Sequence, residues 1–254
     1  MPILSVENLS KSFGGLDALQ DVTFSVYQGQ IKAVIGPNGA GKTTLFNLIS
    51  GSYKPTSGQA FFTGEELTGK SPHSICRMGV ARTFQHSLVF DDMSLLENVL
   101  VGRHSRTKAG ILSATLTLPR HRREEQEAVK VAHEILRRVG LDERAEEVAG
   151  NMPMGERHLL EIARALAAEP RLLLLDEPAA GLNDEETARL GDTVRRIRAD
   201  GVTVLLVEHD MAFVMDVSDE VVVLDYGRKI AEGPPLMILE NEEVIKAYLG
   251  EELS

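Results

Sequence analysis

Two hydrophobic patterns alternate along this chain. Near its start, residues 3–9 and 22–27 alternate apolar and polar positions, and residues 31–35 form a short apolar run. A period of two predicts half-buried strands, and a short apolar run predicts a strand that is buried on both faces. A glycine-rich turn follows, and residues 42–50 then take a helical pattern that Gly51 ends.

The middle of the chain changes from strand signals to helical ones. Residues 58–64 and 79–85 predict further strands, but helical periodicity dominates from about residue 88 to 156. Within that region one helical face is formed by Ala128, Val131, Ala132, Ile135, Leu136 and Val139. The basic, turn-like segment 103–123 predicts no element, and a solvated loop and a partner contact both remain open.

The α/β pattern returns after residue 157. Short apolar runs again predict buried strands, and an amphipathic segment that ends at Gly201 predicts a helix between them. The strands are expected at 171–175, at 202–208 and twice within 220–233, and the helix at 184–201. The pattern as a whole predicts one α/β core that is interrupted by a mostly helical lobe.

Composition and charge narrow the class of protein. The 254 residues are 26% charged and 43% hydrophobic, an ordinary globular balance, and the net charge is −11. This acidity argues against a general nucleic-acid binder. The single cysteine, Cys76, cannot form an internal disulfide, and no apolar run is long enough to cross a membrane. The N-terminus lacks the pattern of a secretion signal, so we expect a cytoplasmic protein that could still dock on a membrane partner.

A phosphate-binding pattern lies between the predicted strand at 31–35 and the predicted helix at 42–50. It fits G-x-x-x-x-G-K-[ST] and consists of Gly36, Pro37, Asn38, Gly39, Ala40, Gly41, Lys42, Thr43 and Thr44. Glycines let backbone N–H groups curl around phosphate oxygens, and the helix N-terminus adds positive partial charge. Lys42 can reach the β- and γ-phosphates, and the Thr43 hydroxyl can hold Mg²⁺. An ordinary glycine-rich βα turn is the alternative.

Two carboxylates follow the buried strand at 171–175. Asp176 can help to hold Mg²⁺, through a water molecule, and Glu177 can polarise an attacking water. A helix N-cap would explain one Asp equally well, so the pair gains its meaning from the phosphate-binding pattern.

Two more polar residues end predicted strands. Gln85 can touch Mg²⁺ or the attacking water, and His209 can hydrogen-bond the γ-phosphate. Both are expected at the edge of an α/β sheet where ligands bind. A purely structural hydrogen bond is the alternative for each.

The order of these segments, together with 151–167 and 178–183, resembles the nucleotide-binding subunits of ABC transporters over essentially the whole chain. The resemblance implies an α/β fold: a RecA-like P-loop NTPase core that hydrolyses ATP with Mg²⁺, an antiparallel β subdomain and an inserted α-helical subdomain. The single nucleotide-binding domain then spans 1–254. Its expected parts are the core with the β subdomain at 1–87 and 157–235, the helical subdomain at 88–156 and a C-terminal helical extension at 236–254.

The resemblance also assigns two further sites. Phe13 matches the aromatic residue that stacks on adenine. Stacking contacts the face of the base rather than its hydrogen-bonding edge, so base selectivity should be modest. Pro153, Met154, Gly155 and Glu156 match the signature that starts a helix and faces the γ-phosphate held by a second subunit. The usual serine and one glycine are missing here. We expect Glu156 to point away from that phosphate, while its role remains open.

Proline in the signature and the basic segment before residue 125 resemble the branched-chain or hydrophobic amino-acid uptake branch. The implied partners are a second ABC ATPase subunit, homologous or identical, two transmembrane permease subunits and, indirectly, a substrate-binding protein, with no nucleic acid. The protein would then be cytoplasmic and peripheral on the inner face of the cell membrane. Asn183 stands where many relatives carry Asp, which weakens the argument that this loop couples the two nucleotide sites through a carboxylate.

Other classes of protein account for fewer of these motifs. The same transport role for urea, short amides or lipopolysaccharide export remains open, because substrate choice lies in other subunits. A soluble ABC ATPase of translation or repair does not suit a single P-loop without sustained heptads. A GTPase or kinase leaves the signature helix unexplained. The tail from Pro234 predicts a packing helix with Ile245 and Leu249 on one face, and a regulatory contact is the alternative.

Overall fold

The structure is a computed structural model that describes residues 1–83, 89–103 and 119–249. The chain divides into two compact units, of which the first comprises 1–85 and 171–254 and the second 86–170. The second junction lies beyond the expected 156/157 boundary, because helix α5 (Met154–Leu166) is continuous and lies in the second unit.

A four-stranded antiparallel sheet forms one layer of the first unit, in the order β2-β1-β4-β5. Its strands are β1 (Pro2–Phe13), β2 (Leu16–Tyr27), β4 (Ser57–Phe62) and β5 (Glu65–Glu66). In β1, Leu4 lies opposite Val26 of β2 and Phe62 of β4. The alternation predicted at 3–9 and 22–27 therefore belongs to two longer strands that share one buried face.

A six-stranded sheet forms the second layer, in the order β10-β9-β3-β8-β7-β6. Its strands are β3 (Ile31–Ile35), β6 (Val80–Arg82), β7 (Leu172–Asp176), β8 (Thr203–Val207), β9 (Glu220–Asp225) and β10 (Arg228–Gly233). All pairings are parallel except that of β10 with β9. The short apolar runs are fully buried in β3, β7 and β8, as strands covered on both faces should be.

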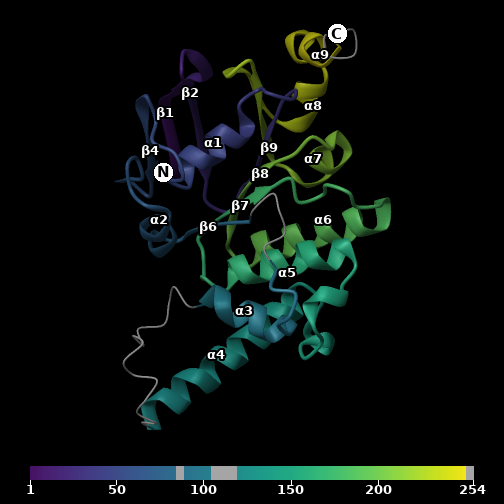
Figure 1. Ribbon diagram of the computed structural model, residues 1–254. Coiled ribbons are helices and arrows are strands. Elements are labelled where there is room, and N and C mark those ends of the chain that lie inside the picture. Colours follow the sequence, from purple (N-terminus) through teal and green to yellow (C-terminus); the bar gives the residue numbers. More distant parts are fainter. Residues whose placement is uncertain (84–88, 104–118, 250–254) are drawn as a thin grey trace. The chain divides into compact units, whose positions relative to one another are not determined.

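Helices cover this sheet on both faces. Figure 1 shows α1 (Lys42–Ile49) between the antiparallel strands and the six-stranded sheet, where Phe46 packs in one core with Leu174 and Leu205. The other helices described in this unit are α2 (Pro72–Met78), α6 (Asp184–Ala199), α7 (Met211–Val217), α8 (Pro235–Leu239) and α9 (Glu242–Leu249). Helix α6 contacts β8 and α7, and α7 contacts α8.

The strand order positions the candidate site. The neighbouring parallel strands β3, β8, β7 and β6 all end at the same edge of the sheet. The phosphate-binding pattern, His209 and Gln85 lie in the segments that follow these strands. Asp176 ends β7, and Glu177 follows it directly. Ligands of open α/β sheets bind at this carboxyl edge.

The second unit is helical. Its elements are α3 (Leu95–Arg103), α4 (Pro119–Arg138), the short 3₁₀ turns η2 (Asp142–Arg144) and η3 (Ala149–Asn151), and α5. Helix α3 packs on α4 and α5. A Cβ at Gly102 would lie 2.2 Å from the backbone oxygen of Arg164, so only glycine allows α3 to approach α5 this closely.

The predicted C-terminal helix is divided into α8 and α9, and its packing differs from the prediction. Ile245, which we expected to pack inward, is 43% exposed, whereas Val244 is buried. The Leu249 side chain and the segment 104–118 lie outside the described residues. Among the helices that the structure describes, none is both long and apolar enough to cross a membrane.

Candidate functional site

The phosphate-binding loop joins β3 to α1, and its glycines adopt a backbone conformation that other residues rarely take. Gly36, Gly39 and Gly41 have φ values of 150°, 77° and 102°, a region that glycine tolerates best. A Cβ at Gly36 would lie 2.1 Å from the Leu224 oxygen, and one at Gly41 would lie 2.5 Å from the Ala18 oxygen. No side chain caps the start of α1, so its N-terminal N–H groups suit an anion.

Lys42 lies across this loop. Its Nζ donates to the backbone oxygens of Gly36 at 2.6 Å and Pro37 at 2.9 Å, and the residue is buried. Thr43, next along α1, is exposed in the first turn. The loop therefore presents backbone N–H groups, one ammonium and one hydroxyl, which is a donor set that fits a nucleotide's phosphates and an accompanying Mg²⁺.

Asp176, at the end of β7, is held by an arginine that the sequence analysis missed. Arg82, the last residue of β6, donates from Nη2 to Asp176 Oδ2 at 2.7 Å. Its Nη1 donates to Asn47 Oδ1 at 2.7 Å and Ser50 Oγ at 2.9 Å. The guanidinium thus joins β6, β7 and the α1 segment, and β6 itself pairs with β7.

The second oxygen of Asp176 fits a role in holding a cation. Among the described residues, Oδ1 is buried without a hydrogen-bond partner. A buried carboxylate oxygen left without a partner is costly, and Mg²⁺ prefers carboxylate oxygens, often through water. The backbone N–H of Asp176 donates to Thr83 Oγ1 at 3.2 Å, which fixes the start of the segment toward Gln85. Gln85 itself lies outside the described residues.

Glu177 follows Asp176 at a sharp turn. Its φ of 48° places it in the left-handed region, which is uncommon for residues other than glycine. Its N–H donates to the Val207 oxygen at 2.9 Å, so the turn is fixed to the end of β8. Such strain is typical of functional positions.

His209 lies two residues beyond β8, and its side chain is 60% exposed. Glu208, between β8 and His209, is completely buried, and the sequence analysis also missed it. Burial raises the pKa of the Glu208 carboxyl, while N–H groups of Ala179, Asp210 and His209 act in the opposite direction. The strand ends thus bring together the loop, Asp176, Glu177 and His209.

Phe13 ends β1 and forms an aromatic pair. Its ring is 43% exposed and meets the Tyr53 ring edge-on, with 5.4 Å between centroids. The Lys11 Nζ lies 4.8 Å from the Phe13 centroid. The sequence analysis did not identify Tyr53 as a neighbour of Phe13. Its position shortly after α1 in the sequence was the signal that could have identified it.

The candidate signature begins α5 in the second unit. Pro153 is the N-cap and supplies no side-chain hydrogen bond, Gly155 is buried, and Met154 is 59% exposed. Glu156 forms an ion pair with Arg144 of η2, and Arg144 also donates from Nε to Glu147 at 2.8 Å. These two glutamates raise the pKa of Arg144. The charge of Glu156 is therefore matched inside this unit.

Asn183 has a local role. Its Oδ1 accepts from the Glu186 N–H at 3.0 Å, and its own N–H donates to Glu186 Oε2 at 3.1 Å. This reciprocal pair is a capping box that starts α6. Asparagine serves this cap as well as aspartate does.

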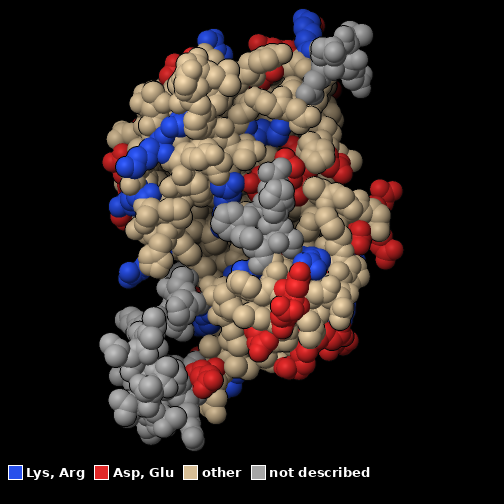
Figure 2. Space-filling model, viewed as in Figure 1, with Lys and Arg blue, Asp and Glu red and all other residues tan. Residues whose placement is uncertain are grey.

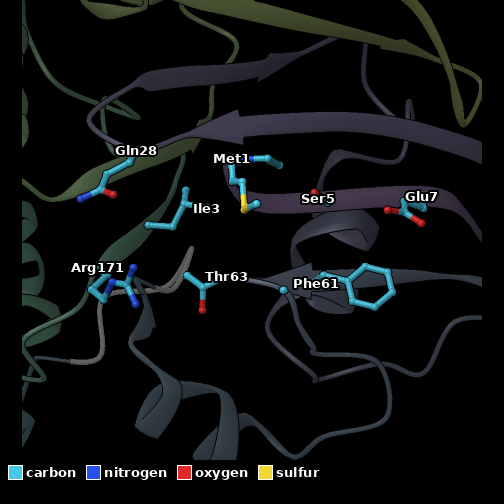
Figure 3. Close-up of a pocket in the computed structure, with 10 residues that line it drawn as sticks. Met1, Ile3, Ser5, Glu7, Gln28, Phe61, Thr63 and Arg171 are labelled. Carbon is cyan, nitrogen blue, oxygen red and sulfur yellow. The ribbon is translucent and has the colours of Figure 1, made fainter.

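A separate hollow of about 460 Å³ lies against β1 and β4 in the first unit. Figure 3 shows Ile3 and Ser5 on one side and Phe61, Thr63 and Arg171 on the other. Its lining residues include none of the candidate site residues. On the face that Figure 2 shows, both acidic and basic side chains lie at the surface.

The chain matches known protein families over most of its length. Residues 19–180 match the family described as "ABC transporter", and residues 228–254 match "Branched-chain amino acid ATP-binding cassette transporter". The chain is 45% identical to the high-affinity branched-chain amino acid transport ATP-binding protein LivG of Escherichia coli K12, over 98% of both chains. It is 46% identical to BraF of Pseudomonas aeruginosa, a protein with the same description, again over 98% of both.

Solved structures match over the same length. An ATP-binding cassette of an ABC transporter in its ADP conformation has a TM-score of 0.87 at 33% identity, covering 98% of this chain and 99% of that one. A nucleotide-free ATP-binding cassette has a TM-score of 0.84, also at 33% identity, with the same coverage. The predicted RecA-like α/β class is confirmed.

Proposed function

Because the chain belongs to the ABC transporter family, we propose that it powers the uptake of branched-chain amino acids as the ATP-binding subunit of an importer. The chain is a nucleotide-binding ATPase subunit. The match of its C-terminal segment to the branched-chain transporter family supports the substrate class, as do the names of LivG and BraF.

One observation carries the proposal for the site: β3, β8 and β7 are neighbours, so the segments after them meet at one edge. In this proposal the N–H groups of the loop from Gly36 to Gly41 bind phosphate oxygens, and Lys42 moves from the loop carbonyls to the β- and γ-phosphates. Thr43 and Asp176 hold Mg²⁺, Asp176 through water, with Gln85 as a further predicted ligand. Bound Mg²⁺ neutralises charge on the phosphates.

Glu177 is proposed as the general base. Its strained turn is fixed to the end of β8 by a backbone hydrogen bond, and its carboxylate would orient and polarise the attacking water. His209 would donate a hydrogen bond to the γ-phosphate from its exposed ring. Phe13, with Tyr53 at its edge, offers a ring face to adenine.

The signature is proposed to act on the nucleotide of a second ATPase subunit, homologous or identical. The uncapped start of α5 and the buried Gly155 leave backbone N–H groups to meet phosphate, and Arg144 neutralises Glu156. Two permeases would anchor the pair to the inner face of the membrane, and a binding protein would deliver substrate outside.

Reconstitution in vesicles with the cognate permeases and binding protein tests this function. We expect uptake of labelled leucine that depends on ATP and is competed by isoleucine and valine. Uptake of urea or a short amide without leucine uptake would overturn the substrate class and keep the ATPase role. ATP hydrolysis that no cognate permease stimulates would overturn the transport role itself.

A further inference from the structure

Glu208 is a buried carboxylate that the proposed chemistry does not use. It follows β8, has no exposed surface, and precedes the exposed His209. A glutamate is almost never this buried unless its oxygens are paired. Its hydrogen-bond partners therefore indicate its role.

The two carboxylate oxygens of Glu208 bind two different loops. Oε1 accepts from the Ala179 N–H at 2.7 Å. Oε2 accepts from the N–H groups of His209 at 2.9 Å and Asp210 at 3.3 Å. Ala179 lies two residues beyond Glu177, so one side chain ties the loop of the proposed base to the loop of the proposed γ-phosphate ligand.

The same oxygen also lies near the His209 ring. The distance from Glu208 Oε2 to His209 Nδ1 is 3.7 Å, too long for a hydrogen bond but close enough for charge to act. The carboxylate therefore holds the His209 backbone and also lies close to its ring.

We propose that Glu208 is a positioning residue that sets the spacing between Glu177 and His209 through its bridge to Ala179. The inference rests on the roles proposed above for those two residues. Glu208 does not meet the reacting atoms itself, since its oxygens are occupied by backbone donors.

Only a glutamate satisfies this bridge. Glutamine keeps the shape but replaces one acceptor by an NH₂ donor, which would face an N–H on one of the two loops. Aspartate keeps the charge but is one methylene shorter, so it cannot reach both loops. A displacement of about 1 Å between reacting groups can reduce a rate about 100-fold.

The test compares E208Q and E208D with a control, D219N, in the reconstituted transporter. Asp219 also accepts a hydrogen bond from a backbone N–H, that of Ile31 at 2.8 Å. Ile31 is the first residue of β3, so this bond is not one of those that Glu208 makes. For each variant, kcat and the Kd for ATP are measured with thermal stability. Hydrogen exchange of the Ala179 and His209 amides reports the bridge directly.

We expect both Glu208 variants to lower kcat by at least about tenfold, to keep the Kd for ATP within about twofold, and to exchange these amides faster. D219N should keep kcat. A Glu208 variant that retains the kcat of D219N would overturn the inference, as would a kcat loss that only follows a fall in stability and ATP affinity.

Two companion variants separate this inference from the proposed function. E177Q and H209A are assayed beside the Glu208 variants. If both retain normal turnover, the proposed catalytic roles fail and the inference falls with them. If they are impaired while E208Q and E208D turn over normally, the proposed function stands and only the positioning role of Glu208 is overturned.

Discussion

Arg82 and Asp176 form an ion pair of 2.7 Å between side chains that are 9% and 0% exposed. The same guanidinium donates to Asn47 and Ser50 of the α1 segment. It also lies against Phe46, with 5.6 Å from its central carbon to the ring centroid. One side chain thus joins the helix after the phosphate loop to the strand that ends at the proposed Mg²⁺ ligand.

Removing this guanidinium should cost stability. We expect R82M to lower the free energy of unfolding by about 3–5 kcal/mol, because it leaves the Asp176 charge buried without its partner. R82K should lie between, since one ammonium cannot reproduce the planar fork. Urea unfolding measures both. R228K serves as the control, because the exposed Arg228 donates to Gln20 Oε1 at the surface. An R82M protein within about 0.5 kcal/mol of wild type would contradict the account.

Adding a methyl group to the phosphate loop should block nucleotide binding. At Gly41, φ is 102° and a Cβ would lie 2.5 Å from the Ala18 oxygen, so G41A must move the backbone. We expect its nucleotide Kd to rise at least about tenfold.

The matched control is G29A. Gly29 also has a positive φ, 74°, but a Cβ there meets nothing within 4 Å. It should lose only about 1 kcal/mol of stability and bind nucleotide normally. Fluorescence titration with a nucleotide analogue compares the two, and equal affinities would refute the cradle.

Removing Arg144 should lower the ATPase rate, because Arg144 neutralises the charge of Glu156. R144M would free a negative charge at the start of α5, and we expect the ATPase rate of the assembled transporter to fall about three- to tenfold. E156Q alone should stay near wild type, because the structure turns that carboxylate toward Arg144. The double variant R144M/E156Q should recover activity relative to R144M, and no recovery would show that Arg144 acts otherwise.

Much of the fold could be predicted from the sequence, because its signals are local. The buried run at 171–175 and the glycine pattern after 31–35 each fix a strand or turn without help from distant residues. Arg82 and Glu208 could not be predicted as partners of Asp176 and Ala179, since those pairings depend on strand order. The partners are 94 and 29 residues apart in the chain.

Contacts between residues that are distant in the sequence also decide which face of a helix is buried and which side chains pair with it. Ile245 has helical spacing in the tail, yet the structure buries Val244 instead, because packing against neighbours selects the face. Glu156 was expected to point away from phosphate, but nothing near it in sequence indicated Arg144, which lies 12 residues earlier.

Lys32 supplies a prediction about pH. It is buried and forms ion pairs with Glu220 at 2.9 Å and Glu232 at 2.5 Å. Burial alone would raise the pKa of Glu220, but hydrogen bonds from Lys32 and Gln30 outweigh it and lower that pKa. The stability that Glu220 contributes is therefore present above its ordinary pKa and lost as the pH falls through the lowered value.

We expect K32M to cost about 3 kcal/mol at neutral pH, the low end for a buried pair because both carboxylates are partly exposed. The difference from wild type should shrink as the pH falls below the ordinary pKa of glutamate and through the lowered pKa of Glu220. K229M is the control, because Lys229 binds Glu232 at the surface and should cost less than about 1 kcal/mol. A difference that stays constant with pH would contradict the assignment.

The role of Glu177 is tested most directly by one paired measurement on E177Q in the assembled transporter: kcat for ATP hydrolysis and the Kd for ATP. We expect kcat to fall at least about 100-fold while the Kd stays within about threefold, because a positioned general base contributes to chemistry rather than to binding. Near-normal turnover by E177Q would contradict this role.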